Sequence, residues 1–182
     1  PIYEILKKQG ACFGSKLGWE RPNWFAPEEE TAQDIYSYGR QNWFPHVGEE
    51  HRAVRERVAL FDQSSFAKFR IIGTDAEKAL NRICANNVAK PSGALTYTQM
   101  LNSKGGIECD LTVARLAKDE FYLVSGTGFR THDSAWIRSQ FLPDEKVELH
   151  DITEEWATFS LMGPLAREVL AQVTENDLEN EN

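Results

Sequence analysis

Residues 97–113 form the stretch that most constrains the fold, because they predict two antiparallel strands joined by a turn. The turn lies within residues 102–106, where glycine can adopt positive φ without steric cost. After the turn, apolar and polar residues alternate with the period of a strand that has one buried face. The apolar set is Ile107, Cys109, Leu111 and Val113, and the polar set is Glu108, Asp110 and Thr112. We therefore expect the Cys109 thiol to point into a core and the Asp110 carboxylate to point away from it.

The composition narrows the classes of function. The chain has 182 residues, of which 41% are hydrophobic and 11% aromatic, and this supports a globular core. A net charge of -8 argues against nucleic acid or an anionic membrane surface as the main partner, since both require a basic face. No apolar run approaches the roughly 20 residues that span a bilayer. The 3 cysteines lack CxxC spacing and the 4 histidines lack paired ligand spacing, so a metal is the weaker interpretation.

Hydrophobic periodicity predicts an α+β fold, an antiparallel sheet with helices packed on one side. The three strands in the middle of the chain follow one another without crossover helices, which disfavours a doubly wound parallel sheet. We expect helices near residues 1–8, 47–60, 75–84, 131–141 and 165–173, and strands near residues 68–72, 95–116 (the hairpin), 121–124, 147–152 and 156–161.

The first part of the sequence is rich in aromatic residues but interrupted by glycine and proline. Residues 10–27 carry Trp19, Trp24 and Phe25, and we expect this segment to lie extended across another surface and bury those rings. We divide the chain into a connecting arm (1–45), one domain (46–173) and a polar tail at a truncation point (174–182). The chain stops just after a predicted helix, which indicates a fragment of a larger protein.

A short glycine-rich turn at residues 125–128 precedes the predicted helix at 131–141. Free amides at such a turn can bind an anion. The turn lacks the lysine of a Walker loop and the spacing of a dinucleotide fingerprint, so it is a weak signal by itself. Asp133 falls in the first turn of the helix, where a carboxylate complements the helix dipole.

Five motifs occur in the order found in the aminomethyltransferase (T-protein) of the glycine cleavage system, a family that this sequence resembles. They are Phe61-Asp62-x-Ser64, Cys84-Ala85-Asn86-Asn87-Val88, Tyr97-Thr98-x-Met100-Leu101-Asn102, Gly105-Gly106-Ile107-x-x-Asp110-Leu111-Thr112-Val113 and Leu161-Met162-Gly163-Pro164. Residues 18–25 resemble the region that joins the flavin part to the folate-binding part of dimethylglycine and sarcosine dehydrogenases. The resemblance covers nearly the whole chain and implies the N-terminal half of the aminomethyltransferase folate-binding fold.

In the dehydrogenases of this family, a flavin domain oxidises an N-methyl amine to an iminium. Tetrahydrofolate in the second module then captures the one-carbon unit as 5,10-methylenetetrahydrofolate. The resemblance therefore implies part of an oxidoreductase acting on CH–NH donors in one-carbon metabolism and glycine catabolism. It implies tetrahydrofolate as the ligand here, and FAD in a flavin domain of the same polypeptide outside this sequence. The compartment would be the cytoplasm in a bacterium or the mitochondrial matrix in a eukaryote.

The sequence contains neither the Gly-x-Gly-x-x-Gly signature of the flavin domain nor the Gly-Glu-Leu-Gly-like stretch of the family's downstream half. We therefore expect the fragment alone to be inactive. Two alternatives remain open. One is a stand-alone glycine cleavage aminomethyltransferase, and the other is a non-enzymatic folate-binding or assembly protein of the same fold.

The resemblance also assigns site residues. Asp110 matches the central aspartate of the family, which lies beside the reacting folate nitrogens, and it is the expected catalytic residue. The family often has two adjacent acids here, whereas this chain has Cys109 before Asp110. Without the resemblance, Asp110 would be interpreted as an ordinary exposed carboxylate of a sheet.

Four further residues are expected to bind the folate. Tyr97 matches a tyrosine that lines the cavity, and Phe66 stands where the family often has a methionine. Gly126 and Thr127 belong to a stretch that often contains asparagine in the family, and they are the other expected cofactor-binding residues. Ordinary core packing is the alternative for Tyr97 and Phe66.

Overall fold

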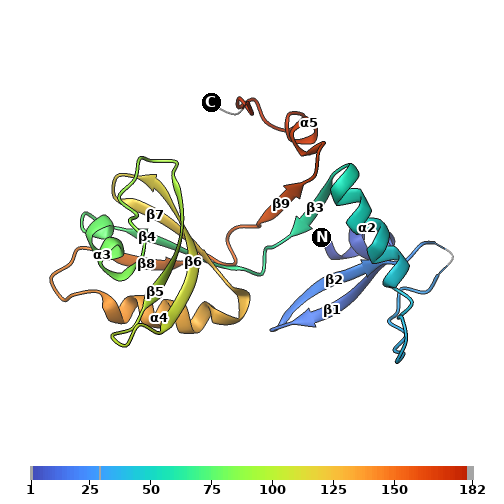
Figure 1. Ribbon diagram of the computed structural model, residues 1–182, viewed down its shortest axis with the longest axis horizontal. Helices are drawn as coiled ribbons and strands as arrows, with labels where there is room; N and C mark the ends of the chain where they lie inside the picture. Colours follow the sequence, from blue (N-terminus) through green and yellow to red (C-terminus); the bar gives the residue numbers. More distant parts are fainter. Residues whose placement is uncertain (1, 29, 180–182) are drawn as a thin grey trace. The chain divides into compact units, whose positions relative to one another are not determined.

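The computed structural model describes residues 2–28 and 30–179. The chain divides into two compact units, each considered by itself below. One unit comprises residues 63–158, and the other is made of the segments before and after it. Figure 1 shows the helices and strands of both.

The unit of residues 63–158 is built on a five-stranded antiparallel sheet with the strand order β5-β6-β7-β4-β8 (Figure 1). The expected hairpin forms the β5–β6 pair, and β7 continues the meander. The strands are β4 (Ala67–Ile72), β5 (Leu95–Leu101), β6 (Ile107–Ala117), β7 (Glu120–Ser125) and β8 (Glu148–Asp151).

One face of this sheet is covered by helices α3 (Ala76–Ile83) and α4 (Arg130–Gln140), the latter preceded by a 3-10 turn, η1 (Thr127–Phe129). Apolar residues of both helices join the sheet residues in one buried cluster. The cluster includes Phe69, Ile71, Leu80, Ile83, Met100, Cys109, Leu111, Val113, Phe121, Leu123 and Ile137. The fold class predicted from the sequence, an antiparallel sheet with helices on one side, is thereby confirmed.

Two local details of this unit differ from expectation. Asp75 precedes α3, but its carboxylate makes no cap bond to the helix and accepts a hydrogen bond from the Lys146 backbone amide instead (2.9 Å). Ile107 was expected on the core face, yet 66% of it is exposed. The register shifts between Met100 and Leu101, so Ile107 lies beyond the irregularity, next to the turn that closes the hairpin.

The other unit contains two small antiparallel pairs, β1–β2 and β3–β9. Its elements are α1 (Ile2–Lys8), β1 (Ala11–Lys16), β2 (Trp19–Phe25), α2 (Phe44–Glu56), β3 (Ala59–Asp62), β9 (Phe159–Met162) and α5 (Ala166–Leu170). The segment at 10–27 is therefore a paired hairpin rather than a single extended arm. Trp24 is buried as expected, with Cys12 and Ala26 beside it.

The helix expected at 47–60 starts earlier and ends at Glu56. Residues 59–62 leave the helical pattern because they pair with β9, a contact that no local pattern encodes. The strand expected at 156–161 is correspondingly short, and Trp156 lies outside it, 60% exposed. The expected division after residue 45 falls inside α2.

Candidate functional site

The strand register gathers the predicted site residues on the face of the sheet opposite α3 and α4. In the β5–β6 pair, Asp110 faces Gln99, and Thr112 faces Tyr97. Asp110 and Tyr97 are both exposed, whereas the intervening Leu111 is buried. The alternation predicted from the sequence is therefore correct for Asp110, which points away from the core.

The same register extends across the sheet to the other predicted residues. Ser125 pairs with Leu111 on one side and with Ala67 on the other. Gly126 follows the last residue of β7 and Phe66 precedes the first residue of β4, while Asp110 precedes Leu111 within β6. The chain neighbours of the paired residues Leu111, Ser125 and Ala67 thus come to the same end of these strands, which are about 4.8 Å apart.

Asp110 is held by neutral hydrogen-bond donors on its own face. Gln99 Nε2 donates to Asp110 Oδ1 at 3.0 Å. A hydrogen bond with Asp110 raises the pKa of the Tyr97 phenol, and desolvation adds to the effect. The carboxylate thus accepts from an amide and a phenol while remaining open to solvent, which leaves acceptor capacity for a ligand N–H.

Gly126 and Thr127 follow directly after β7, and their contacts differ. Gly126 has no side chain, and an added Cβ would lie 3.2 Å from a ring carbon of Phe129. Thr127 behaves differently, because its hydroxyl donates to Ser65 Oγ at 3.1 Å and Ser65 is buried. The structure therefore brings Asp110 and Tyr97 to one face of the sheet and places Gly126 and Phe66 at the ends of β7 and β4, whereas the Thr127 hydroxyl is directed to Ser65. The ligand-binding roles of all five residues stay predictions.

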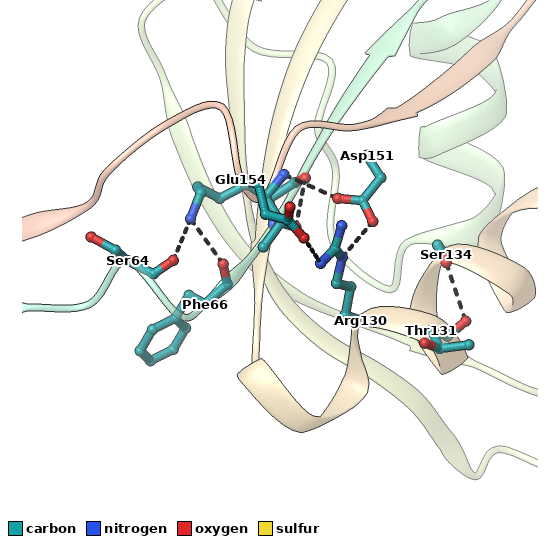
Figure 2. Close-up of polar contacts among 9 residues, drawn as sticks. Ser64, Phe66, Arg130, Thr131, Ser134, Asp151 and Glu154 are labelled. Atoms are coloured by element: carbon teal, nitrogen blue, oxygen red, sulfur yellow. Dashed lines mark hydrogen bonds and ion pairs between the residues drawn. The ribbon is translucent and has the colours of Figure 1, made fainter. Parts of the chain in front are cut away.

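Lys68 is a residue of this face that sequence reasoning did not single out. It pairs with Val124, which pairs with Thr112, so it belongs to the cross-strand row of Tyr97. Lys68 is fully buried, and its Nζ donates to the backbone oxygens of Ser64 (2.7 Å) and Phe66 (3.1 Å) (Figure 2). The signal for it in the sequence is its place in β4, where Lys68 stands at a polar-face position between two apolar residues.

A salt-bridged cluster fixes the start of α4 against the end of β8. Arg130 donates to Asp151 Oδ2 at 2.6 Å and to Glu154 Oε1 at 2.8 Å (Figure 2). Burial by itself would raise the pKa of Asp151, but hydrogen bonds from Arg130 and Thr153 outweigh it and lower the pKa. These contacts hold η1, and with it Gly126 and Thr127, in place.

A second polar cluster lies on the helix-covered side of β6. Ligand-type atoms of Cys109, His132 and Asp133 lie within 4.8 Å of one another. Within residues 2–28 and 30–179 this is the single group of three such residues with a spacing that could hold a metal ion. His132 Nδ1 lies 3.0 Å from Asp133 Oδ1, and His132 Nε2 lies 3.4 Å from Glu108 Oε2. Sequence reasoning assigned Asp133 only a role in complementing the helix dipole, whereas in the structure it is buried beside a thiol.

The fold and this sheet face define a domain of the glycine cleavage T-protein type. The solved aminomethyltransferase T of the glycine cleavage system from Bartonella henselae superposes with a TM-score of 0.76 and 28% identity. The match covers 94% of this chain and 42% of that one, which fits the N-terminal half of the fold. Residues 2–182 match the GCVT N-terminal domain, and the chain belongs to that family.

Two of the curated relatives are named as an oxidase and a dehydrogenase. A 4-methylaminobutanoate oxidase (formaldehyde-forming) from Paenarthrobacter nicotinovorans is 38% identical over 100% of this chain and 22% of its own length. Mitochondrial dimethylglycine dehydrogenase from Rattus norvegicus is 36% identical over 99% of this chain and 21% of its own length. The chain thus spans about a fifth of these relatives. No helix in the described ranges is long and apolar enough to cross a bilayer.

Proposed function

We propose that this chain is part of the tetrahydrofolate-binding module of a flavin-dependent N-methyl amine dehydrogenase. The parent protein would act on a dimethylglycine- or sarcosine-type amine and would carry FAD outside this chain. The single observation that carries the proposal is the exposed Asp110, whose carboxylate accepts a hydrogen bond from Gln99 on the face of the sheet opposite α3 and α4. The names of the relatives supply the oxidoreductase class.

The reaction that the module would perform is capture of an iminium by two folate nitrogens. N5 and N10 of tetrahydrofolate form bonds to the iminium carbon, and the bond from that carbon to the substrate nitrogen breaks. The two folate protons leave with the amine, so the products are 5,10-methylenetetrahydrofolate and a protonated amine. The charges balance without a further reactant.

Asp110 would assist by accepting a hydrogen bond from the attacking nitrogen and by stabilising the positive charge that develops there. Tyr97 and Phe66 would supply aromatic surface for the flat ring systems of the ligand. Gly126 would leave room for the ligand beside the carboxylate, and Thr127 would line the cavity through its backbone.

The test uses the full-length parent protein with Asp110→Asn. The amide keeps the shape of the side chain but loses the negative charge, so methylenetetrahydrofolate formation should fall by roughly 100-fold, the lower range for general acid–base groups. Amine oxidation, measured by flavin reduction, should stay within about twofold. Free formaldehyde should rise in proportion, as expected when the iminium is hydrolysed instead of captured. An equal loss of both activities would contradict the assigned role.

The reading frame of the parent gene distinguishes the enzyme classes. A dinucleotide fingerprint upstream of residue 1 supports the dehydrogenase, because the flavin domain needs that signature. A start codon directly before this sequence, together with transfer from a lipoyl-carried aminomethyl group, would support the stand-alone aminomethyltransferase instead.

A further inference from the structure

We propose that Cys109, His132 and Asp133 form a binding site for a divalent cation of the zinc class. The site lies on the helix-covered side of β6, so it goes beyond the folate proposal and does not depend on it. Cys109 comes from β6, while His132 and Asp133 come from the first turns of α4. The three side chains meet because α4 packs on the face of the sheet to which Cys109 points.

The spacing of the three donor atoms suits one ion. Zinc binds sulfur at about 2.3 Å and nitrogen or oxygen at about 2.0–2.2 Å, so tetrahedral ligand atoms lie about 3.5 Å apart. The atoms here all lie within 4.8 Å of one another, and the His132–Asp133 pair is at 3.0 Å. Side-chain rotations that shorten the longest separation by about 1 Å complete the geometry.

The arrangement around His132 is the one that metal-binding histidines commonly have. His132 Nδ1 lies 3.0 Å from Asp133 Oδ1, while Nε2 lies 3.4 Å from Glu108 Oε2. A carboxylate on the second ring nitrogen fixes the tautomer that leaves the first nitrogen free for the ion. Glu108 is itself held by Asn102, whose Nδ2 donates to Glu108 Oε1 at 2.8 Å.

Charge and burial also favour a cation. Asp133 is 1% exposed, and burying a carboxylate is costly without a compensating charge. The His132 side chain is 49% exposed, which gives the ion an entry route and a water for its fourth position. A thiolate, an imidazole and a carboxylate together select zinc, cobalt or a similar ion over magnesium or calcium.

The experiment adds Co²⁺ to the 182-residue chain and follows the near-ultraviolet charge-transfer absorption that reports a cobalt–thiolate bond. The expected result is a band that saturates at one equivalent and disappears when Zn²⁺ is added. Cys109→Ser should abolish the band, and His132→Gln should weaken Co²⁺ binding at least tenfold.

Cys12→Ser is the matched control. Cys12 is also buried and its thiol donates to a carboxylate, Asp34 Oδ1 at 3.5 Å, but no histidine completes a group of three there. This variant should keep the full band. If Cys109→Ser does not fold, His132→Gln decides, since that half-exposed side chain is replaceable without opening a cavity. Absence of a band in the unaltered chain, or an equal band in Cys109→Ser or His132→Gln, would overturn the proposal.

Discussion

Replacing Lys68 by methionine tests whether the buried lysine orders the segment that carries Phe66. Lys68 is fully buried, and its ammonium group donates to the carbonyl oxygens of Ser64 and Phe66. Methionine fills nearly the same volume with an unbranched chain but donates nothing. The substitution therefore removes the donor and leaves both acceptors in place.

The magnitude follows from those two acceptors. A partly buried carbonyl that loses its donor costs about 1–3 kcal/mol, and bonds from a charged donor lie at the upper end. Removing the desolvation penalty of the ammonium offsets part of this loss, as it does when a buried ion is replaced by an apolar side chain. We expect a net destabilisation of about 2–4 kcal/mol in the unit of residues 63–158.

Hydrogen exchange of the amides in β4 and β7 measures this free energy, because those strands belong to the core of that unit. Arg70→Met is the matched control. Arg70 lies two residues along the same strand and face, but its pair with Glu120 (2.7 Å) is at the surface, with 45% of the arginine side chain exposed. It should leave protection unchanged. Equal protection in Lys68→Met and Arg70→Met would refute the reasoning.

Three other substitutions test separate parts of the unit. Leu80→Ala removes a fully buried side chain of α3 and should cost about 2–5 kcal/mol, measured by the same exchange experiment, whereas a cost near zero would contradict the assigned core. The Tyr97 phenol should titrate above its ordinary pKa in an ultraviolet titration, and Asp110→Asn should lower that pKa because the hydrogen bond to the carboxylate is removed; an unchanged value would exclude the hydrogen bond. The pKa of Asp151 is lowered in the folded chain, so its stabilising contribution is present above the unfolded pKa and is lost as the pH falls through the folded one. Arg130→Met should flatten that acid dependence in a urea series, and an unaltered acid dependence would show that Arg130 is not its cause.

The sequence predicted the elements whose periodicity is strong and local. The hairpin, the α3 stripe of Leu80 and Ile83, and the direction of Asp110 all follow from alternation or helical spacing. It was wrong where pairing with a distant segment decides the structure. The helix predicted at 47–60 ends at Glu56, and residues 59–62 form β3 because β9 supplies their hydrogen bonds across about a hundred residues of chain.

Only part of the candidate site could be predicted from the sequence. A period of two indicates which way Asp110 points, and the resemblance implies a folate cavity in front of it, but neither shows where Gly126 and Phe66 lie. Their places depend on how β7 registers against β6 and β4 against β7, which turn lengths and core packing determine together. The burial of Lys68 and Asp133 was missed for a related reason. A charged residue is expected to be exposed to solvent until the elements that pack around it are known.

The two faces of β6 connect the separate findings. A strand places successive side chains on opposite sides, so Cys109 and Asp110 cannot serve the same site although they are adjacent. An ion bound through Cys109 would fix β6 to α4 on the core side. On the opposite face of β6, it would leave the Asp110 carboxylate and its hydrogen bond from Gln99 unchanged. Loss of the ion should therefore loosen the hairpin without removing any predicted folate contact, whereas Asp110→Asn should remove that contact without loosening the hairpin.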